Sequence, residues 1–121
     1  MRQTIEVKQG IVENGIVVLK TAHTIKESLK AGERVLVDSD NLAFVYILED
    51  EDAFIYVTLP NSVWPVLKQA LLEDLSVKLT DGKTVIQLDE LNEEMNYLID
   101  NIKDNSNYGE EMERLVEELL S

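Results

Sequence analysis

Two apolar segments, "FVYIL" and "FIYVTL", follow each other with only "EDEDA" between them. Both are rich in β-branched and aromatic residues, which suit the pleated surface of a strand. They are apolar at nearly every position instead of at alternate positions, and this pattern predicts strands that are covered on both faces. We therefore expect them at the centre of a sheet, or with one face against a partner subunit. The residues expected to be buried are Phe44, Val45, Tyr46, Ile47, Phe54, Ile55 and Val57.

The neighbouring sequence extends these segments into a meander. Strands are predicted at about 33–38, 42–48 and 53–59, separated by the polar turns "SDN" and "EDED". Pro60 ends the third strand, and "SVWPVLKQALLED" then predicts a helix with a proline in its first turn, where the missing N–H costs little. A second hairpin is predicted from "SVKLTDGKTVIQL", which turns at Asp81-Gly82.

The first hairpin turns at Asn14-Gly15, the strongest two-residue turn signal, because both positions take positive φ. Counting from this turn pairs Val12 with Val17 and places His23 opposite Glu6 as a surface pair. Gly10 is the expected place for a bulge in the first strand. Residues 21–32 fit a short helix or an edge strand with a loop, and we favour the second interpretation.

The last third of the chain predicts two helices, "DELNEEMNYLIDNIKD" and "NYGEEMERLVEELL", each with one apolar stripe. The stripes are Leu91, Met95, Leu98 and Ile102, and then Tyr108, Met112, Leu115 and Leu119. The predicted fold class is therefore α+β: a largely antiparallel β-sheet with one helix after the central strands and a C-terminal helical pair. We expect a single domain over residues 1–121.

The charge of the chain is strongly asymmetric. Residues 1–36 carry six basic and four acidic side chains, whereas residues 37–121 carry five basic and twenty acidic ones, within a net charge of −13. Such a surface repels phosphate backbones and anionic lipids, so we expect no direct nucleic-acid binding and no membrane binding. No apolar run reaches the roughly 18 residues of a membrane span, no secretory leader is expected, and cysteine is absent. These features predict a cytoplasmic protein.

The stretch "VDSDNLAFVYILEDEDAF" holds six carboxylates and invites a metal interpretation. Aligned with a calcium-binding loop, it places Leu42 where a ligand belongs and Ala43 where a glycine must turn. The apolar strand between the two acidic groups also holds them apart. Hydrated turn residues are therefore the favoured interpretation, and a partial metal site is a minor alternative. No cofactor and no catalytic residue is predicted.

Two groups of residues are candidates for binding. The acidic backs of the last two helices form a predicted partner-binding face, which comprises Glu93, Glu94, Asp100, Glu110, Glu113 and Glu117. Solvated helix faces are the more common explanation of such charge. Tyr56 and Trp64 could line a ligand pocket, although a tryptophan at this position is more typical of a core.

The string "VLVDSDNLAFVYILEDEDAFIYVTLP", followed by Trp64 and later by "NYGEE", resembles an uncharacterised family of small acidic Bacillus-type bacterial proteins, the YjbL-like group. The resemblance runs from about residue 34 to the C-terminus, whereas residues 1–30 match poorly. It implies a cytoplasmic bacterial protein and carries over no activity, ligand or catalytic residue.

The leading hypothesis for function is a non-enzymatic protein-interaction module, with a homodimer as one form. Its partner is a protein, basic if it binds the acidic helices, or one that meets an apolar sheet surface. The alternative is an enzyme or small-ligand binder that uses carboxylates with a divalent metal, and a second alternative is a nucleic-acid mimic. A metal enzyme requires three or more convergent ligands, whereas a mimic requires carboxylates spaced like phosphates.

Overall fold

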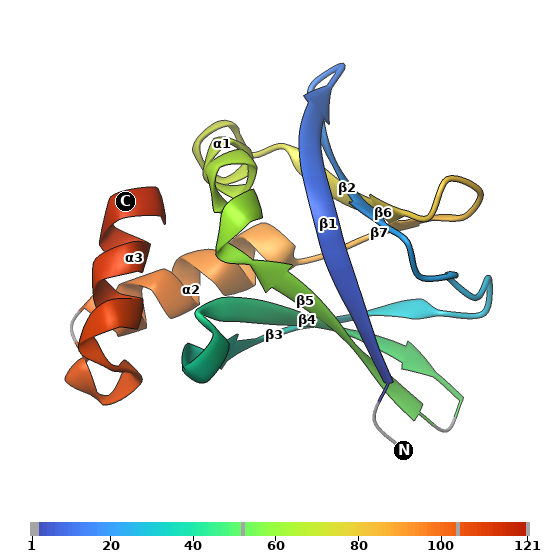
Figure 1. The fold of residues 1–121 in the computed structure, drawn as a ribbon. Helices are drawn as coiled ribbons and strands as arrows, with labels where there is room; N and C mark the ends of the chain where they lie inside the picture. The colour runs from blue at the N-terminus through green and yellow to red at the C-terminus, as the bar shows by residue number, and fades with distance from the viewer. Residues whose placement is uncertain (1–2, 52, 104, 121) are drawn as a thin grey trace.

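The computed structural model describes residues 3–51, 53–103 and 105–120. Within them, one curled seven-stranded sheet is covered on its inner face by helices (Figure 1). The strands are β1 (Gln3–Glu13), β2 (Ile16–Thr21), β3 (Lys30–Asp38), β4 (Ala43–Asp50), β5 (Ala53–Pro60), β6 (Ser76–Thr80) and β7 (Val85–Gln87). The helices are α1 (Trp64–Glu73), α2 (Leu91–Lys103) and α3 (Glu110–Leu120), with short 3-10 turns η1 (Ser39–Asn41), η2 (Asn61–Val63) and η3 (Ser106–Tyr108).

The sheet is mixed, with strand order β3-β4-β5-β1-β2-β6-β7. Each predicted hairpin and the meander supply antiparallel pairs, but β1 runs parallel to β5 and β2 runs parallel to β6. The α+β class is confirmed, whereas the expectation of a largely antiparallel sheet missed both parallel pairs. They join segments that are distant in the chain, and no turn between them reveals the pairing.

Strand β1 connects the two halves of the sheet. Its first residues, Gln3–Glu6, pair with β5, and its remainder from Val7 onward pairs with β2 (Figure 1). The register with β2 shifts between Val7 and Gln9, so the irregularity lies before the expected Gly10. This shift lets one strand leave β5 and continue beside β2, because a bulge bends the strand and increases its twist.

The predicted turn register holds only as far as this irregularity. Val12 is opposite Val17, as expected. Beyond the shift, Val7 is opposite Thr21, where β2 ends, so the prediction that His23 lies opposite Glu6 is wrong. The Thr21 hydroxyl instead donates a hydrogen bond to the Glu6 carbonyl, at 2.8 Å.

Gly10 allows α1 to lie directly on β1. A Cβ atom at this position would stand 2.6 Å from Cγ2 of Val66, which is shorter than any normal contact. The glycine is therefore explained by close packing of a helix on the sheet, and not by the bulge that the sequence suggested.

Residues 22–29 form a loop that leads into the edge strand β3, as the favoured interpretation of this segment predicted. Ile25 and Leu29 of this loop are buried in the core. The Ile25 backbone N–H donates to the Asp81 carboxylate, at 2.8 Å. Together with the N–H groups of Thr84 and Lys83, this bond lowers the pKa of Asp81 to about 2. The loop is thus tied to the β6–β7 turn by its backbone.

The burial of the central strands is only partly as predicted. Residues 43–48 of β4 are all buried, which confirms a strand covered on both faces. Strand β5 instead alternates, and Phe54 is 47% exposed, so the prediction that Phe54 is buried is wrong. Phe54 pairs with Glu49 near the β4–β5 turn, on the side of the sheet away from the helices.

The helices bury stripes close to those predicted. In α2 the innermost residues are Leu91, Met95, Ile99 and Ile102, and in α3 they are Met112, Val116 and Leu120. Leu98, Leu115 and Leu119 are only partly buried against this core. In α2 one of the four predicted positions is displaced by one residue, from Leu98 to Ile99. In α3 two are displaced, from Leu115 to Val116 and from Leu119 to Leu120, so the buried face of α3 is rotated relative to the predicted stripe.

Gly32 provides a test of how closely β3 approaches β4. A Cβ atom there would stand 2.5 Å from the backbone oxygen of Ile47, which cannot move without disturbing the sheet. We expect Gly32→Ala to lower the free energy of unfolding by about 1–3 kcal/mol, as overpacking does. Denaturant titration measures this change. Ser28→Ala, in the exposed loop, is the control, and equal stability of the two variants would contradict the close approach.

Candidate functional site

The two edge strands of the sheet, β3 and β7, contact each other where the sheet curls round. A cavity of about 340 Å³ opens beside this contact and is named here the seam cavity. Its polar lining comes from the edge of β3, the end of α1, and the connection from β7 into α2. The carboxylates around it are those of Glu33, Asp74, Asp89, Glu90 and Glu93.

Tyr46, on β4, connects the two sides of the seam. Its ring is fully buried in the core, and its hydroxyl donates to the Asp89 carbonyl at 2.5 Å. Burial raises the pKa of the Tyr46 hydroxyl far above its ordinary value, while a backbone hydrogen bond from Glu33 acts in the opposite direction. The hydroxyl is therefore neutral, and its hydrogen bond links β4 to the connection between β7 and α2.

The backbone around the seam cavity is unusual. Glu33 and Glu90 have φ values of 59° and 65°, in the left-handed region that a side chain disfavours by roughly 1–2 kcal/mol. Glu33 lies in the interval where the register of β3 against β4 shifts, between Ala31 and Val35. Asp74 also has positive φ, but as the residue that ends α1 it is in an ordinary position for that conformation. The irregular backbone directs Glu33 and Glu90 toward the same cavity.

The carboxylates of the seam cavity repel one another. A hydrogen bond and the charge of Glu93 raise the pKa of Glu90, with smaller contributions from Glu33 and Asp89. The residues that line the cavity include no lysine or arginine to offset this charge. Among the described residues, however, no group of three or more His, Cys, Asp or Glu side chains has the arrangement of a metal site.

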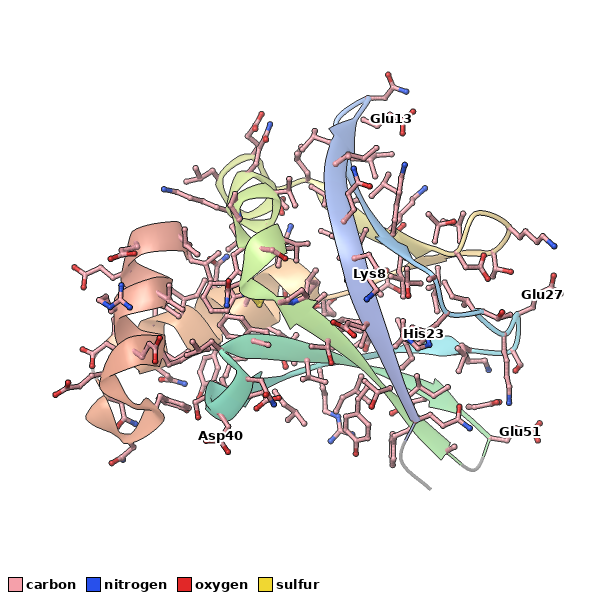
Figure 2. All side chains as sticks on the ribbon, in the orientation of Figure 1. Lys8, Glu13, His23, Glu27, Asp40 and Glu51 are labelled. Atoms are coloured by element: carbon pink, nitrogen blue, oxygen red, sulfur yellow. The ribbon has the colours of Figure 1, made fainter. Side chains whose placement is uncertain are left out.

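The two acidic turns of the β3–β4–β5 meander lie at opposite ends of β4. Asp40, in the first turn, and Glu51, in the second, are far apart in Figure 2. Asp38 accepts hydrogen bonds from the backbone and side-chain amides of Asn41, and Asp50 accepts one from the Glu51 backbone. These carboxylates act as turn residues, as the favoured interpretation held.

The predicted acidic face is divided between different parts of the molecule. Glu93 lines the seam cavity, whereas Glu110 lines a separate hollow beside Asp40. Asp100 and Glu117 are exposed on α2 and α3, and the remaining two members, Glu94 and Glu113, are partly buried. A basic partner for these helices stays a prediction.

The two predicted pocket aromatics are not brought together. Trp64 is fully buried, donates its indole N–H to the Leu59 carbonyl at 3.1 Å, and packs against Phe44 with ring centroids 5.2 Å apart. Tyr56 is half-buried and lies opposite Ile47, on the other face of the sheet.

That other face carries the second feature of interest, which we name the outer β3–β5 face. It comprises Leu36, Val45, Ile47, Phe54 and Tyr56, which alternate along their strands with residues of the core. Leu36 is 45% exposed and Phe54 is 47% exposed. The guanidinium of Arg34 lies 5.7 Å from the centre of the Phe54 ring. Sequence reasoning named Tyr56 but missed Arg34 and the exposure of Phe54.

Comparison with known proteins identifies relatives along nearly the whole chain. The sequence pattern of UPF0738, a family of unknown function, matches residues 5–120. The chain belongs to the UPF0738 family. A UPF0738 protein of Bacillus licheniformis is 43% identical over 120 residues, 99% of both chains. The UPF0738 protein YjbL of Bacillus subtilis is 52% identical over 91 residues, 75% of both chains. No solved structure matches.

The family assignment confirms the resemblance to the YjbL-like group and extends it. The matched region begins at residue 5, so the first hairpin belongs to the family pattern as well. No helix among the described residues has the length and apolarity needed to cross a membrane. Glu33 and Glu90 escaped sequence reasoning, since neither is a residue type that signals a left-handed backbone.

The bond across the seam can be tested with Tyr46→Phe. This change keeps the buried ring and leaves the Asp89 carbonyl without its donor, so we expect a loss of about 1 kcal/mol in unfolding free energy. Tyr97→Phe is the matched control, because Tyr97 is 66% exposed. Equal denaturation midpoints for the two variants would show that the hydroxyl does not hold the seam.

The repulsion within the seam cavity predicts an unusual pH response. Because the folded protein raises the pKa of Glu90, the ionised form is disfavoured in the fold, and stability is gained as pH falls toward the ordinary glutamate pKa of 4.5. Glu90→Gln removes this charge, so we expect the variant to be more stable than wild type at pH 7. The advantage should shrink as pH falls to about 5.

Thermal midpoints of wild type and variant across this pH range measure the effect. Glu27→Gln, in the exposed loop, controls for the change in net charge. A Glu90→Gln variant that is less stable than wild type at pH 7 would contradict the repulsion.

Proposed function

We propose that the protein is a non-enzymatic protein-interaction module that binds its partner through the outer β3–β5 face. The observation that supports this proposal is the exposure of Leu36 and Phe54 on one side of the sheet, on different strands. Val45 and Ile47 lie on β4 between them but are each only 4% exposed, so the exposed apolar area of this face comes from Leu36 and Phe54. Large apolar side chains exposed on the same face of a sheet are a feature of interaction sites.

The composition of this face also fits an interface. Aromatic residues and arginine are enriched in protein interfaces, and the face combines Phe54 and Tyr56 with the guanidinium of Arg34. Arg34 is on β3 and Phe54 is on β5, so the arginine side chain extends across β4 to reach the ring. The cation–π contact orders a long side chain before binding, and this lowers the entropy cost of the interface.

The alternatives have weaker support. The seam cavity offers carboxylates, but within the described ranges no three of them have the arrangement of metal ligands, and the metal-enzyme hypothesis requires such a set. A nucleic-acid mimic requires one continuous acidic face, whereas Glu93 and Glu110 line separate hollows. The interaction module is therefore the hypothesis that we favour.

Site-specific photo-cross-linking in cells that naturally contain the protein tests the proposal. A benzoylphenylalanine at position 54 preserves the aromatic ring, and we expect it to form covalent protein adducts. Position 72 is the control. Leu72 is an exposed apolar residue (75%), but it lies on α1 and not on the outer β3–β5 face, so we expect no adducts from it. The adducts from position 54 should decrease at least tenfold when Leu36→Ser is added, since this change removes apolar contact area.

A third probe at Glu117 separates the outer β3–β5 face from the acidic helices. Adducts from position 117 alone would support a partner bound to α3 and would contradict our assignment of the face. Equal adducts from positions 54 and 72 would indicate nonspecific contact and would also contradict it.

A further inference from the structure

We infer that the partner bound by the outer β3–β5 face is a second copy of this chain, arranged about a two-fold axis. This inference rests on the proposed function of the face and goes beyond it by naming the occupant. It is carried by the charges on the face, by their positions beside the apolar residues, and by the distribution of the remaining charge in the molecule.

The first charge is that of Arg34. The ion pairs in the part of the chain that the structure describes are Lys8 with Glu6 and Arg114 with Glu118. Arg34 thus forms no ion pair there, although the chain holds 24 acidic residues, and its guanidinium lies against Phe54 instead. A guanidinium has five N–H donors in a fixed plane, which match a carboxylate, so the face calls for an acidic group from a partner.

The second charge is that of Glu49, on the same face. Glu49 follows Val45 and Ile47 in the alternation of β4 and pairs in register with Phe54. It is half-buried and lies opposite Lys30 in the β3–β4 register, but among the described residues it forms no ion pair. Within the part of the chain that the structure describes, one face therefore carries a cation and an anion without an ion pair, and the exposed Phe54 ring lies beside both.

A two-fold contact satisfies all of these groups at once. In such a contact, residue i of one copy meets residue j of the other, and j meets i. The Arg34 guanidinium of each copy can then meet the Glu49 carboxylate of the other, while Phe54, in register with Glu49, lies at the apolar centre. The face is thus complementary to itself in both charge and polarity. A partner of different sequence would need its own acidic, basic and apolar groups at matching positions.

The remaining charge also favours this orientation. Residues 89–121 hold eleven acidic and two basic side chains, and this part of the chain includes α2 and α3. Contacts of Phe44 with Trp64, and of Tyr46 with Asp89, place the helices on the inner face of the sheet. Two copies that meet through their outer faces keep these acidic layers apart, and repulsion fades over a Debye length of about 8 Å at physiological salt.

Sedimentation velocity on the whole chain tests the inference with a charge swap. We expect wild type to form a dimer of the 13.8 kDa chain at concentrations of about 10–100 µM, a range typical of modest interfaces. Arg34→Glu and Glu49→Arg should each raise the dissociation constant at least tenfold, because each places like charges opposite one another. The double variant Arg34→Glu/Glu49→Arg should restore dimerisation to within about threefold of wild type.

Arg114→Glu is the matched control, because it reverses an arginine on α3 and should leave the dimer unchanged. Circular dichroism confirms that each variant is folded. A wild type that stays monomeric would overturn the inference, and so would a double variant that is no tighter than the single variants. If wild type is monomeric and position 54 forms adducts with a different protein, the partner is not a second copy of this chain, but the proposed docking face still stands.

Discussion

The pairing of β1 on both of its sides is the constraint on which the rest of the structure depends. Its first residues extend the β3–β4–β5 meander in parallel, and its later residues begin the β2–β6–β7 half of the sheet. The register shift near Val7 turns the strand from one half to the other. The resulting curl brings the edges β3 and β7 together, and this places the seam cavity and the outer β3–β5 face at different parts of one sheet.

The two faces of the sheet have different roles because β4 is buried on both. Phe44, Tyr46 and Leu48 belong to the core on the helix side of the sheet, where Phe44 packs against Trp64. Val45 and Ile47 are buried on the outer side, with Leu36 and Phe54 exposed nearby. The core therefore uses one face of β4, and on the second face the apolar side chains exposed to solvent are those of Leu36 and Phe54.

The sequence predicted what local chemistry determines. The turn at Asn14-Gly15 fixed the pairing of Val12 with Val17, and apolar periodicity located the strands and helices correctly. The exposure of Phe54 could not be predicted. A run of apolar residues does not show which end of a strand extends beyond the residues that pack on it. The seam cavity was also missed, because Glu33 and Glu90 are distant in the chain and meet only through the curl of the sheet.

The parallel pairs have a consequence for how the chain reaches this structure. Gln3 is paired with Ile55, and Ile16 with Ser76. The strands with which the first hairpin pairs are therefore synthesised about 50 to 60 residues after it. Loop closure over such separations is slow, and a high contact order lowers the folding rate. On the ribosome the hairpin emerges with unpaired edges and with Val17 and Leu19 uncovered. That nascent hairpin is the stage at which this protein is most exposed to aggregation and to chaperones.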